Sequence, residues 1–359
     1  MKNIVVIYGG RSPEHDISVL TGLHCAKHIT DDYIVRLVYM TKGNRFVMGK
    51  RKIDHYISGK CNMWAECRFS NGALYKCGLF GGKVCDVWCV VNCCHGGSGE
   101  SGELAGAMNI AGIPMTGCDG HSAFIQQSKS ATREILTTHG FAQPKFQRVK
   151  KGESADIKIK LPVIVKPDGL GSSIGITVAK TNEELDAGLE LAFTMGDAAV
   201  VEEYIENMRE VNIAVMRRNG ELVTSAAEVV EGGEFFSFDE KYLNAESGFV
   251  KKGTGKDDEF AKSHYHEIAE LAKNAYEIFG SSGVVRSDFM VTSDRIILNE
   301  NNTVPGFMAY HLWLKNGVPY GVVIDDLMGD AVAEFRGRQG VKTEFGSEIL
   351  VKNRVLAEK

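Results

Sequence analysis

The sequence predicts an α/β (α+β) protein with more than one domain, and three observations support this prediction. The chain has 359 residues, which is more than one domain usually holds and suggests two or three. Roughly the first 120 residues alternate short apolar strands with helical stretches, the pattern of an open sheet covered by helices. After Glu202 the strands become longer, and one strongly amphipathic helix is expected at 268–279.

Composition and charge narrow the class of protein. Hydrophobic residues make up 44% of the chain and charged residues 24%, and no segment approaches the ~18 consecutive apolar residues of a membrane helix. The first apolar run, at 4–8, is only strand length and lacks a secretory cleavage pattern, so we expect a cytoplasmic protein without a membrane partner. A net charge of -5 without a large basic patch argues against nucleic acid as a partner.

All nine cysteines lie between Cys25 and Cys118. An odd number of cysteines in a chain without a signal peptide predicts free thiols. Cys85, Cys89 and Cys93 share the parity of one strand and are interpreted as small core residues on one of its faces. The alternative is a zinc site without a CxxC pair, for which the candidate ligands are Cys61, Cys67, Cys77 and Cys85.

The N-terminal region is expected to lead from its first strand into a ligand-binding edge. Its main strands and its second helix are predicted at 4–8, 34–39, 87–91 and 103–111. Ser12 as N-cap, Pro13 at the first helical position and Glu14 behind it predict a helix start directly after a glycine turn. Glu14 would then lie at the carboxyl end of the first strand, where open sheets bind ligands.

A second region is predicted to begin near Ser122. The periodicity favours one helix from there through Leu136, and a buried strand at 163–166 precedes a run of glycine and serine. Thr181 and Glu184 form the sequence signature of a capping box, which predicts the start of the next helix.

A segment in the last quarter of the chain says most about chemistry. Two apolar runs flank a polar turn, so we expect a hairpin in which Asp288 lies opposite Glu300 and Arg286 lies opposite Asn302. The alternation along a strand then places all four side chains on one face. Two carboxylates and an amide oxygen suit Mg²⁺ that is shared with substrate phosphates. The alternative is a solvated hairpin with a surface salt bridge.

Two further segments favour a nucleotide. The glycine-serine run at 169–175 follows a strand that ends in Lys166; its backbone N–H groups could approach a phosphate, although a plain turn is the alternative. A buried lysine is costly to desolvate unless it meets an anion, which favours the phosphate interpretation. The segment at 200–206 joins an apolar strand to paired carboxylates, which could line a purine and a ribose; the alternative is a strand that leaves the core.

Five ordered motifs resemble those of the D-alanine:D-alanine ligases. They are GGRSPEHDIS at 9–18, HGGSGESG at 95–102, PVIVKP with GSSIG at 162–175, FFSFDEKY at 235–242 and NENNTVPGF at 299–307. The resemblance covers nearly the whole chain, and its order makes it specific. It implies a three-domain ATP-grasp fold: an N-terminal open parallel-sheet domain (1–120), a central subdomain (121–203) and a C-terminal subdomain with the metal site (204–359).

The resemblance also implies the site residues. ATP would lie between the second and third domains, in contact with Lys129, Lys166, Ser172, Ser173, Glu202, Glu203, Ile205, Glu210 and Lys241. Two Mg²⁺ ions, with Mn²⁺ as the alternative ion, would be held by Asp288, Glu300 and Asn302. The first amino acid would be anchored by Glu14 and His95. The implied catalytic residues are Glu14, Ser172, Tyr242, Arg286 and Gly306, the last two forming an oxyanion hole.

The implied reaction forms a dipeptide for peptidoglycan precursors. ATP would phosphorylate a carboxylate, and the amine of a second amino acid would attack the acyl phosphate. A lid over 232–252 would exclude water, because hydrolysis competes with ligation. Family members commonly pair through the first domain, so a homodimer is expected.

Two positions depart from the family pattern. His311 stands where the family usually has a serine that binds the second amino acid, and Ser128 stands where an acid is common. An imidazole can still donate a hydrogen bond to a carboxylate, so His311 is a candidate substrate-binding residue. One alternative is therefore a ligase with a different acceptor amino acid or hydroxy acid. A second alternative is a non-catalytic nucleotide-binding protein.

Overall fold

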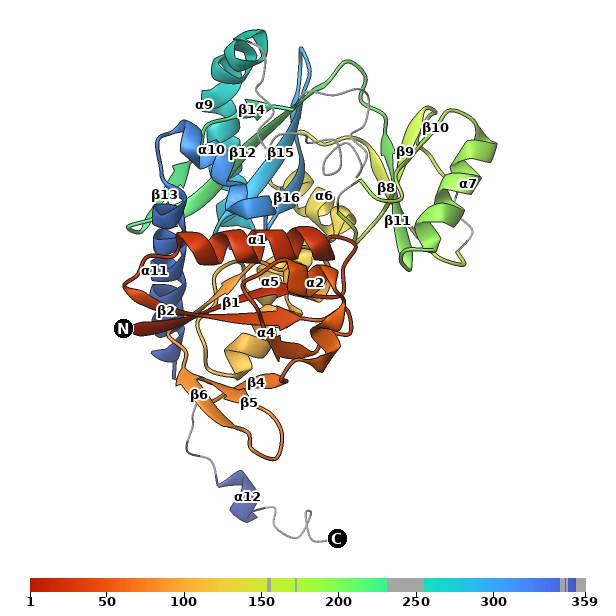
Figure 1. The fold of residues 1–359 in the computed structure, drawn as a ribbon. Helices are drawn as coiled ribbons and strands as arrows, with labels where there is room; N and C mark the ends of the chain where they lie inside the picture. Colours follow the sequence, from red (N-terminus) through yellow and green to blue (C-terminus); the bar gives the residue numbers. More distant parts are fainter. Residues whose placement is uncertain (154–155, 172, 231–254, 343–345, 347, 353–359) are drawn as a thin grey trace.

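The computed structural model describes residues 1–153, 156–171, 173–230, 255–342, 346 and 348–352. These residues form four sheets with helices packed against them (Figure 1). The predicted mixture of helices and sheets is confirmed. Within this described part of the chain, no helix combines the length and the apolar character needed to cross a membrane.

The N-terminal sheet has the strand order β3-β2-β1-β7. Its strands are β1 (Lys2–Gly9), β2 (Tyr33–Met40), β3 (Phe46–Met48) and β7 (Cys89–Asn92). Strand β1 is parallel to β2 and β7, and β3 is an antiparallel edge strand, which confirms an open and mainly parallel sheet. The helical segments of this region are α1 (His15–His28), α2 (Asp54–Ile57), η1 (Lys60–Met63), α3 (Gly97–Glu100) and α4 (Glu103–Ile110).

The first helix begins later than predicted. Helix α1 starts at His15 with Glu14 as its N-cap, so the prediction that Ser12 is the N-cap is wrong. Ser12 instead shapes the turn that precedes the helix, because its Oγ accepts a hydrogen bond of 3.0 Å from the Glu14 N–H. Glu14 is therefore held between the end of β1 and the start of α1, at the predicted edge of the sheet.

The cysteine-rich stretch forms a small sheet of its own. Strands β4 (Cys67–Ser70), β5 (Ala73–Lys76) and β6 (Gly82–Asp86) pair in the order β4-β5-β6. Cys85 lies in β6 and Cys89 in β7, so the prediction that they share one strand is wrong. All nine cysteines are free, as predicted, and among the described residues no group of three or more His, Cys, Asp or Glu could hold a metal ion.

A small antiparallel sheet projects as a separate lobe (Figure 1). Its strands β8 (Phe146–Lys150), β9 (Val163–Pro167), β10 (Thr177–Ala179) and β11 (Ala198–Glu203) have the order β10-β9-β11-β8. Helix α7 (Asn182–Phe193) packs on it and begins with the predicted capping box of Thr181 and Glu184.

The C-terminal sheet carries the predicted hairpin. It contains β12 (Arg209–Arg218), β13 (Glu221–Thr224), β14 (Glu228–Val229), β15 (Val285–Val291) and β16 (Ile296–Asn302). The long helix α9 (Gly255–Ile278) packs against this sheet and confirms the predicted amphipathic helix. The remaining helical segments are η2 (Gly306–Ala309), α10 (Tyr310–Lys315), α11 (Tyr320–Gln339) and α12 (Ile349–Lys352).

The helix predicted from Ser122 through Leu136 is two helices. Helix α5 (Gly120–Gln127) ends before Ser128, and α6 (Lys129–Thr138) begins directly after it with Ser128 as N-cap. Ala123 of α5 and Leu136 of α6 are buried in the core of the C-terminal sheet. The break therefore places Lys129 at the start of a helix that packs with the hairpin. The small lobe begins directly after this helix in the sequence.

Helix α11 returns the end of the chain to the N-terminal sheet. Its buried residues Tyr320, Val323, Ile324 and Leu327 share one hydrophobic core with Ile4 and Val6 of β1. The first and last parts of the chain therefore stabilise each other.

Candidate functional site

The hairpin of β15 and β16 has the predicted register. Asp288 pairs with Glu300 and Arg286 pairs with Asn302, so the four side chains start on one face of the sheet. The pairing shifts after Asp288, because Phe289 pairs with Leu298 and leaves Asn299 as an extra residue in β16. This β-bulge was not predicted.

Asp288 is fully engaged by its neighbours. Its Oδ1 accepts a hydrogen bond of 2.6 Å from Arg286 Nε, and its Oδ2 accepts bonds of 2.7 Å from Arg286 Nη2 and 3.0 Å from Asn302 Nδ2. Such a two-bond ion pair fixes both side chains in one plane. The guanidinium that the sequence assigned to an oxyanion hole is therefore held beside the carboxylate that it assigned to a metal.

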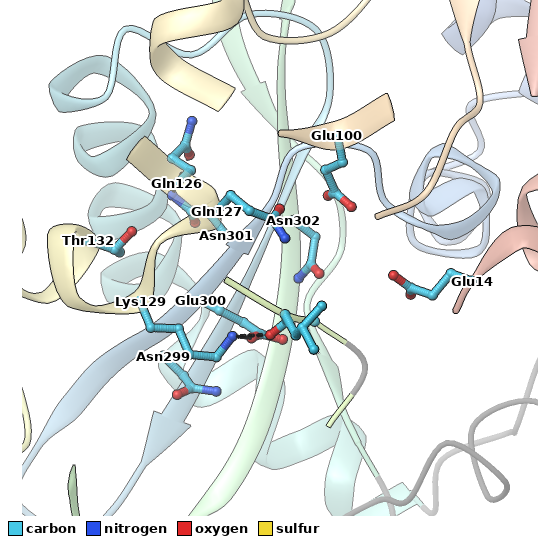
Figure 2. Close-up of a pocket in the computed structure, with 12 residues that line it drawn as sticks. Glu14, Glu100, Gln126, Gln127, Lys129, Thr132, Asn299, Glu300, Asn301 and Asn302 are labelled. Atoms are coloured by element: carbon cyan, nitrogen blue, oxygen red, sulfur yellow. Dashed lines mark hydrogen bonds and ion pairs between the residues drawn. The ribbon is translucent and has the colours of Figure 1, made fainter. Parts of the chain in front are cut away.

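A cleft opens beside this row of polar side chains (Figure 2). Lys129 faces Glu300 across 4.0 Å and donates a hydrogen bond to the carbonyl oxygen of Leu170. Glu14 and Glu100 approach the cleft from the N-terminal region (Figure 2). The structure thus brings together residues from β16, the start of α6, the glycine-serine run and the N-terminal sheet.

A buried ion cluster lies behind the cleft. Glu202 accepts hydrogen bonds of 2.7 Å from Lys166 Nζ and 2.9 Å from Arg133 Nε, and the side chains of all three are almost fully buried. Burial acts to raise the pKa of Glu202, but Arg133 and Lys166 outweigh it and hold that pKa well below its ordinary value. Burial lowers the pKa of Lys166, which the carboxylate of Glu202 opposes. Glu202 thus orients Lys166, a contact that the sequence did not predict.

The other residues expected near the base of a nucleotide lie at the end of β11 and the start of β12. Glu203 pairs with Arg295 at 3.5 Å, and the backbone carbonyl oxygen of Glu210 accepts a hydrogen bond from the N–H of Val230. Ile205 is buried in a small apolar cluster with Met290 and Ile297. Ile205 thus forms an apolar wall, and Glu203 and Glu210 lie nearby in the chain as polar groups, the combination that the sequence predicted for a purine and a ribose.

Two carboxylates from the N-terminal region lie close together. A Cβ on Gly96 would lie 2.9 Å from Glu14 Oε2 and 2.4 Å from Ser12 Oγ, so this close approach requires glycine. Glu100 accepts hydrogen bonds from the N–H groups of Gly96, at 2.8 Å, and Val304, at 3.1 Å. Burial raises the pKa of Glu100 to about 7, and the charge of Glu14 adds to the shift.

His95 ties the N-terminal sheet to the loop that follows β16. Its Nδ1 lies 2.6 Å from the carbonyl oxygen of Val304, and its Nε2 lies 2.8 Å from the hydroxyl of Thr21. Burial lowers the pKa of His95. Both ring nitrogens therefore have protein partners, and a direct contact with substrate would require one of them to be exchanged.

A left-handed turn follows Gly306. The three non-glycine residues Phe307, Met308 and Ala309 have φ values of 50°, 56° and 54°. Left-handed backbone costs about 1–2 kcal/mol per residue, so the surroundings must hold it in place. Met308 and Ala309 are buried, and the N–H of Phe307 lies 3.4 Å from the Thr21 hydroxyl.

His311 lies in the first turn of α10 and forms an ion pair with a carboxylate. Its Nε2 is 3.1 Å from Glu228 Oε2, and Lys315 Nζ is 2.8 Å from Glu228 Oε1. Burial acts to raise the pKa of Glu228, but its bonds to His311 and Lys315 bring that pKa below its ordinary value.

The Glu228 cluster lies in the same cross-strand row as the hairpin carboxylates. Glu228 pairs with Asn212, Asn212 pairs with Asp288, and Asp288 pairs with Glu300. Residues that are directly opposite share a face, so these four form one polar row across four strands, roughly 14 Å long. Asn212 Oδ1 is buried and finds no hydrogen-bond partner among the described residues.

Three predicted site residues, Ser172, Lys241 and Tyr242, lie outside the described residues, as does the predicted lid at 232–252. Ser173 is described and has a left-handed φ of 56° in the glycine-serine run. The predicted link from Glu14 through Ser172 to Tyr242 is therefore untested.

Sequence reasoning missed several residues of the site as individual candidates, namely Glu100, Arg133, Asp168, Asn299, Asn212 and Glu228. Arg133 follows Lys129 by four residues, so their shared helix face was a usable signal. Glu100 lies in the same motif as His95. The other four depend on contacts distant in sequence.

The donor set of Asp288, Glu300 and Asn302 fits a hard cation. All three offer oxygen atoms from directly paired positions of one hairpin, and Mg²⁺ prefers such ligands together with water and phosphate. In this structure Arg286 donates two hydrogen bonds to the Asp288 carboxylate, so a cation bound there would have to displace at least one of them.

Comparisons with known proteins agree with this geometry. The family model described as D-ala D-ala ligase N-terminus matches residues 3–118, and the model described as D-ala D-ala ligase C-terminus matches residues 135–332. A D-alanine--D-alanine ligase of Enterococcus hirae is 31% identical and aligns with 94% of this chain and 98% of its own length.

Two solved structures are similar over almost the whole chain. The D-alanine-D-alanine ligase from Coxiella burnetii has a TM-score of 0.79 and 22% identity, covering 94% of this chain and 97% of its own. The VanG D-Ala:D-Ser ligase from Enterococcus faecalis has a TM-score of 0.75 and 25% identity, covering 92% of this chain and 99% of its own. The first of these shows the fold alone.

Proposed function

Since the chain belongs to the D-alanine–D-alanine ligase family, we propose that it joins two D-alanine molecules at the expense of ATP, for peptidoglycan precursors. The observation that carries the proposal is the register of Asp288, Glu300, Arg286 and Asn302, with Lys129 facing Glu300 across the cleft. That arrangement combines charge neutralisation with a donor for a developing oxyanion.

The first D-alanine binds through its ammonium group to the acidic side of the cleft. Glu14 and Glu100 face this side, and the pKa of Glu100 is raised to about 7, first by burial and next by the charge of Glu14. A cation between the two carboxylates relieves that repulsion. His95 positions the adjoining loop through Val304.

ATP binds with its phosphates toward Lys129 and Lys166, together with Lys241 and the serines of the glycine-serine run, Ser172 and Ser173. The base lies against Ile205, with Glu203 and Glu210 as polar neighbours. Glu202 keeps Lys166 charged and oriented, because it is the buried partner of that lysine. A carboxylate oxygen of the first D-alanine then attacks the γ-phosphorus, and ADP leaves.

Asp288, Glu300 and Asn302 would hold Mg²⁺. The resemblance to the family implies two ions, and Mn²⁺ could replace them. When bound, the cation neutralises charge that develops on the transferred phosphoryl group. The amine of the second D-alanine attacks the acyl carbon, loses a proton, and phosphate leaves. Arg286 and the N–H of Gly306 stabilise the oxyanion of this step.

The second amino acid binds near the other end of the polar row. His311 replaces the serine expected there, and Glu228 and Asn212 supply the neighbouring polar groups. VanG, by its name, uses D-serine, so the acceptor amino acid differs among ligases of this fold. Closure by the segment that contains Tyr242 would keep water from the acyl phosphate.

The test is phosphate release by the purified full chain with ATP, Mg²⁺ and D-alanine. Release that requires D-alanine, with formation of the dipeptide, supports the proposal. Release only with D-serine, D-lactate or another acceptor would favour a ligase of different specificity. No release with any acceptor, combined with tight ATP binding, would favour a non-catalytic nucleotide-binding protein.

We also propose that the protein acts in the cytoplasm as a homodimer. Ile110 of α4 and Phe124 of α5 are 91% and 67% exposed, near a groove lined by both helices and by Phe335 of α11. Large apolar side chains in this setting favour a second copy as the partner. Light scattering at micromolar concentration tests this, and a monomer would contradict it.

A further inference from the structure

Asp168 connects the small lobe to the start of α6. It lies directly after β9, and its backbone N–H donates a hydrogen bond of 3.0 Å to Ala198 of β11, so it belongs to the small sheet. Its side chain, by contrast, bonds to α6. Oδ1 accepts a bond of 2.8 Å from the N–H of Ser130, and Oδ2 accepts a bond of 2.9 Å from the Ser130 hydroxyl.

In the first turn of α6, the N–H groups without intrahelical partners bond to Asp168 and Ser128. Lys129 N–H donates to the Asp168 carbonyl oxygen at 2.9 Å, and Ser130 N–H donates to its carboxylate. Ala131 N–H donates to Ser128 Oγ at 3.3 Å, and Thr132 N–H makes the first intrahelical bond, to the Ser128 carbonyl oxygen at 3.0 Å. The first N–H groups of a helix lack intrahelical partners, so Asp168, which accepts from Lys129 N–H and Ser130 N–H, is part of the cap of a helix that packs in a different core.

The same place is unfavourable for Lys129. The N-terminal end of a helix carries partial positive charge, and a lysine at the first position adds to it. The Asp168 carboxylate compensates, because it is nearly buried and binds directly at that end. Burial acts to raise the pKa of Asp168, but its bonds from Ser130 and Arg148 lower it, so the group is charged at neutral pH.

We propose that Asp168 is a positioning residue for ATP binding: it fixes Lys129 of α6 against the strand that carries Lys166. The proposal rests on the proposed function, in which both lysines meet phosphates. Helix α6 packs in the core of the C-terminal sheet, whereas β9 belongs to the small lobe. Asp168 therefore sets the distance between two lysines that come from different parts of the fold.

The contacts of neighbouring residues support one rigid unit. Gln127 donates a hydrogen bond of 2.9 Å to the carbonyl oxygen of Gly169, and Lys129 Nζ donates to that of Leu170. Successive residues at the junction between α5 and α6 thus bond to successive residues of the turn after β9. Without the Asp168 carboxylate, the hydrogen bonds from the Gln127 amide to Gly169 and from the Lys129 ammonium to Leu170 remain, but the helix start loses its anion.

The main test uses Asp168→Asn in the full chain, which keeps the size and one acceptor oxygen but removes the charge. Calorimetry measures binding of a non-hydrolysable ATP analogue with Mg²⁺, and kinetics measure KM for ATP and for D-alanine. We expect analogue affinity and KM for ATP to weaken by about tenfold, while KM for D-alanine changes less than about twofold. Asp197→Asn, an exposed aspartate of the same lobe, is the matched control and should bind like the wild type.

A double-mutant cycle separates positioning from a general loosening of the fold. If Asp168 acts through Lys129, then Asp168→Asn should weaken analogue binding much less in a Lys129→Met background than in the wild type. Additive losses, or an equal rise of KM for ATP and for D-alanine, would overturn the proposal. If Asp168→Asn folds poorly, Ser130→Ala replaces it, because this variant removes one bond to the carboxylate and should give a smaller loss of the same kind. Unchanged analogue binding in Ser130→Ala would then overturn the proposal.

The two proposals fail separately. A wild type that binds the analogue but does not ligate D-alanine would overturn the proposed function, and the binding cycle would still decide the role of Asp168.

Discussion

The proposed nucleotide side and the proposed acceptor side contain the same kind of ion cluster, but the two clusters differ in burial. Glu202 with Lys166 and Arg133 has side-chain exposures of only 2–6%, whereas Glu228 with His311 and Lys315 has exposures of 16–34%. In both clusters one carboxylate joins two basic groups. Because solvent screens the second cluster, the first should determine stability and the second should tolerate change. The difference suggests a fixed nucleotide side and an adaptable acceptor side.

The largest effect is expected from Glu202→Gln. The variant leaves Lys166 and Arg133 buried without their charge partner, which costs about 3–5 kcal/mol in the free energy of unfolding. Urea unfolding at pH 7 measures it, with Glu203→Gln as control, since Glu203 is half-buried and pairs with Arg295. A depressed pKa contributes stability above the unfolded value, so the difference between wild type and variant should shrink as the pH falls below about 4. Equal losses in both variants would break the comparison.

Next in size is Glu300→Gln, which tests the row between the two sides. The fold should remain intact, because Glu300 is partly exposed and lies at the sheet surface. Turnover should fall by at least about 100-fold, since the hard anionic ligand for a cation is lost. Phosphate release at saturating Mg²⁺ measures it. Wild-type turnover in this variant would refute the metal assignment.

These two predictions also mark what the sequence could and could not provide. The hairpin register was predictable because alternation and turn position are local properties. The bulge at Asn299 and the break at Ser128 were not, because apolar periodicity runs through both positions. The break depends on Asp168, which is distant in sequence, and Glu202 turns toward Arg133 only because α6 packs there. Thus the polar residue types were predictable, but their partners depended on tertiary contacts.

A third expected effect concerns Glu100, on the acidic wall between the two sides. Its pKa rises from the ordinary 4.5 to about 7, so the folded protein binds a proton more tightly than the unfolded chain. Stability from this group is complete below about pH 4.5 and is lost as the pH rises through 7, by up to about 3 kcal/mol. Unfolding at pH 5 and pH 8 measures the difference, which Glu100→Gln should reduce. The same pH slope in both proteins would contradict the shift.

A smaller effect is expected from His311→Ala on the acceptor side. The second D-alanine should show a KM raised by about tenfold, the usual scale for one lost hydrogen bond to a charged group. KM for ATP should stay within about twofold, because the nucleotide side is separate. Initial rates at varied acceptor concentration measure this. A parallel change in both constants would remove the distinction between the two sides.

The smallest expected effect is on stability in Glu228→Gln. Its partners His311 and Lys315 are partly exposed, so the free energy of unfolding should change by no more than about 1 kcal/mol. Urea unfolding beside Glu202→Gln gives the direct comparison. A loss as large as that of Glu202→Gln would show that the acceptor side is as fixed as the nucleotide side.

The return of α11 to the N-terminal sheet has a consequence for biosynthesis. The interior of the first sheet is completed by Tyr320, Val323 and Leu327, which a ribosome makes long after β1. Domains usually fold in order of synthesis, but this one cannot finish its interior until α11 has emerged. Until then β1 leaves an apolar surface that a chaperone could cover, and truncation before α11 should leave the nascent product prone to aggregation.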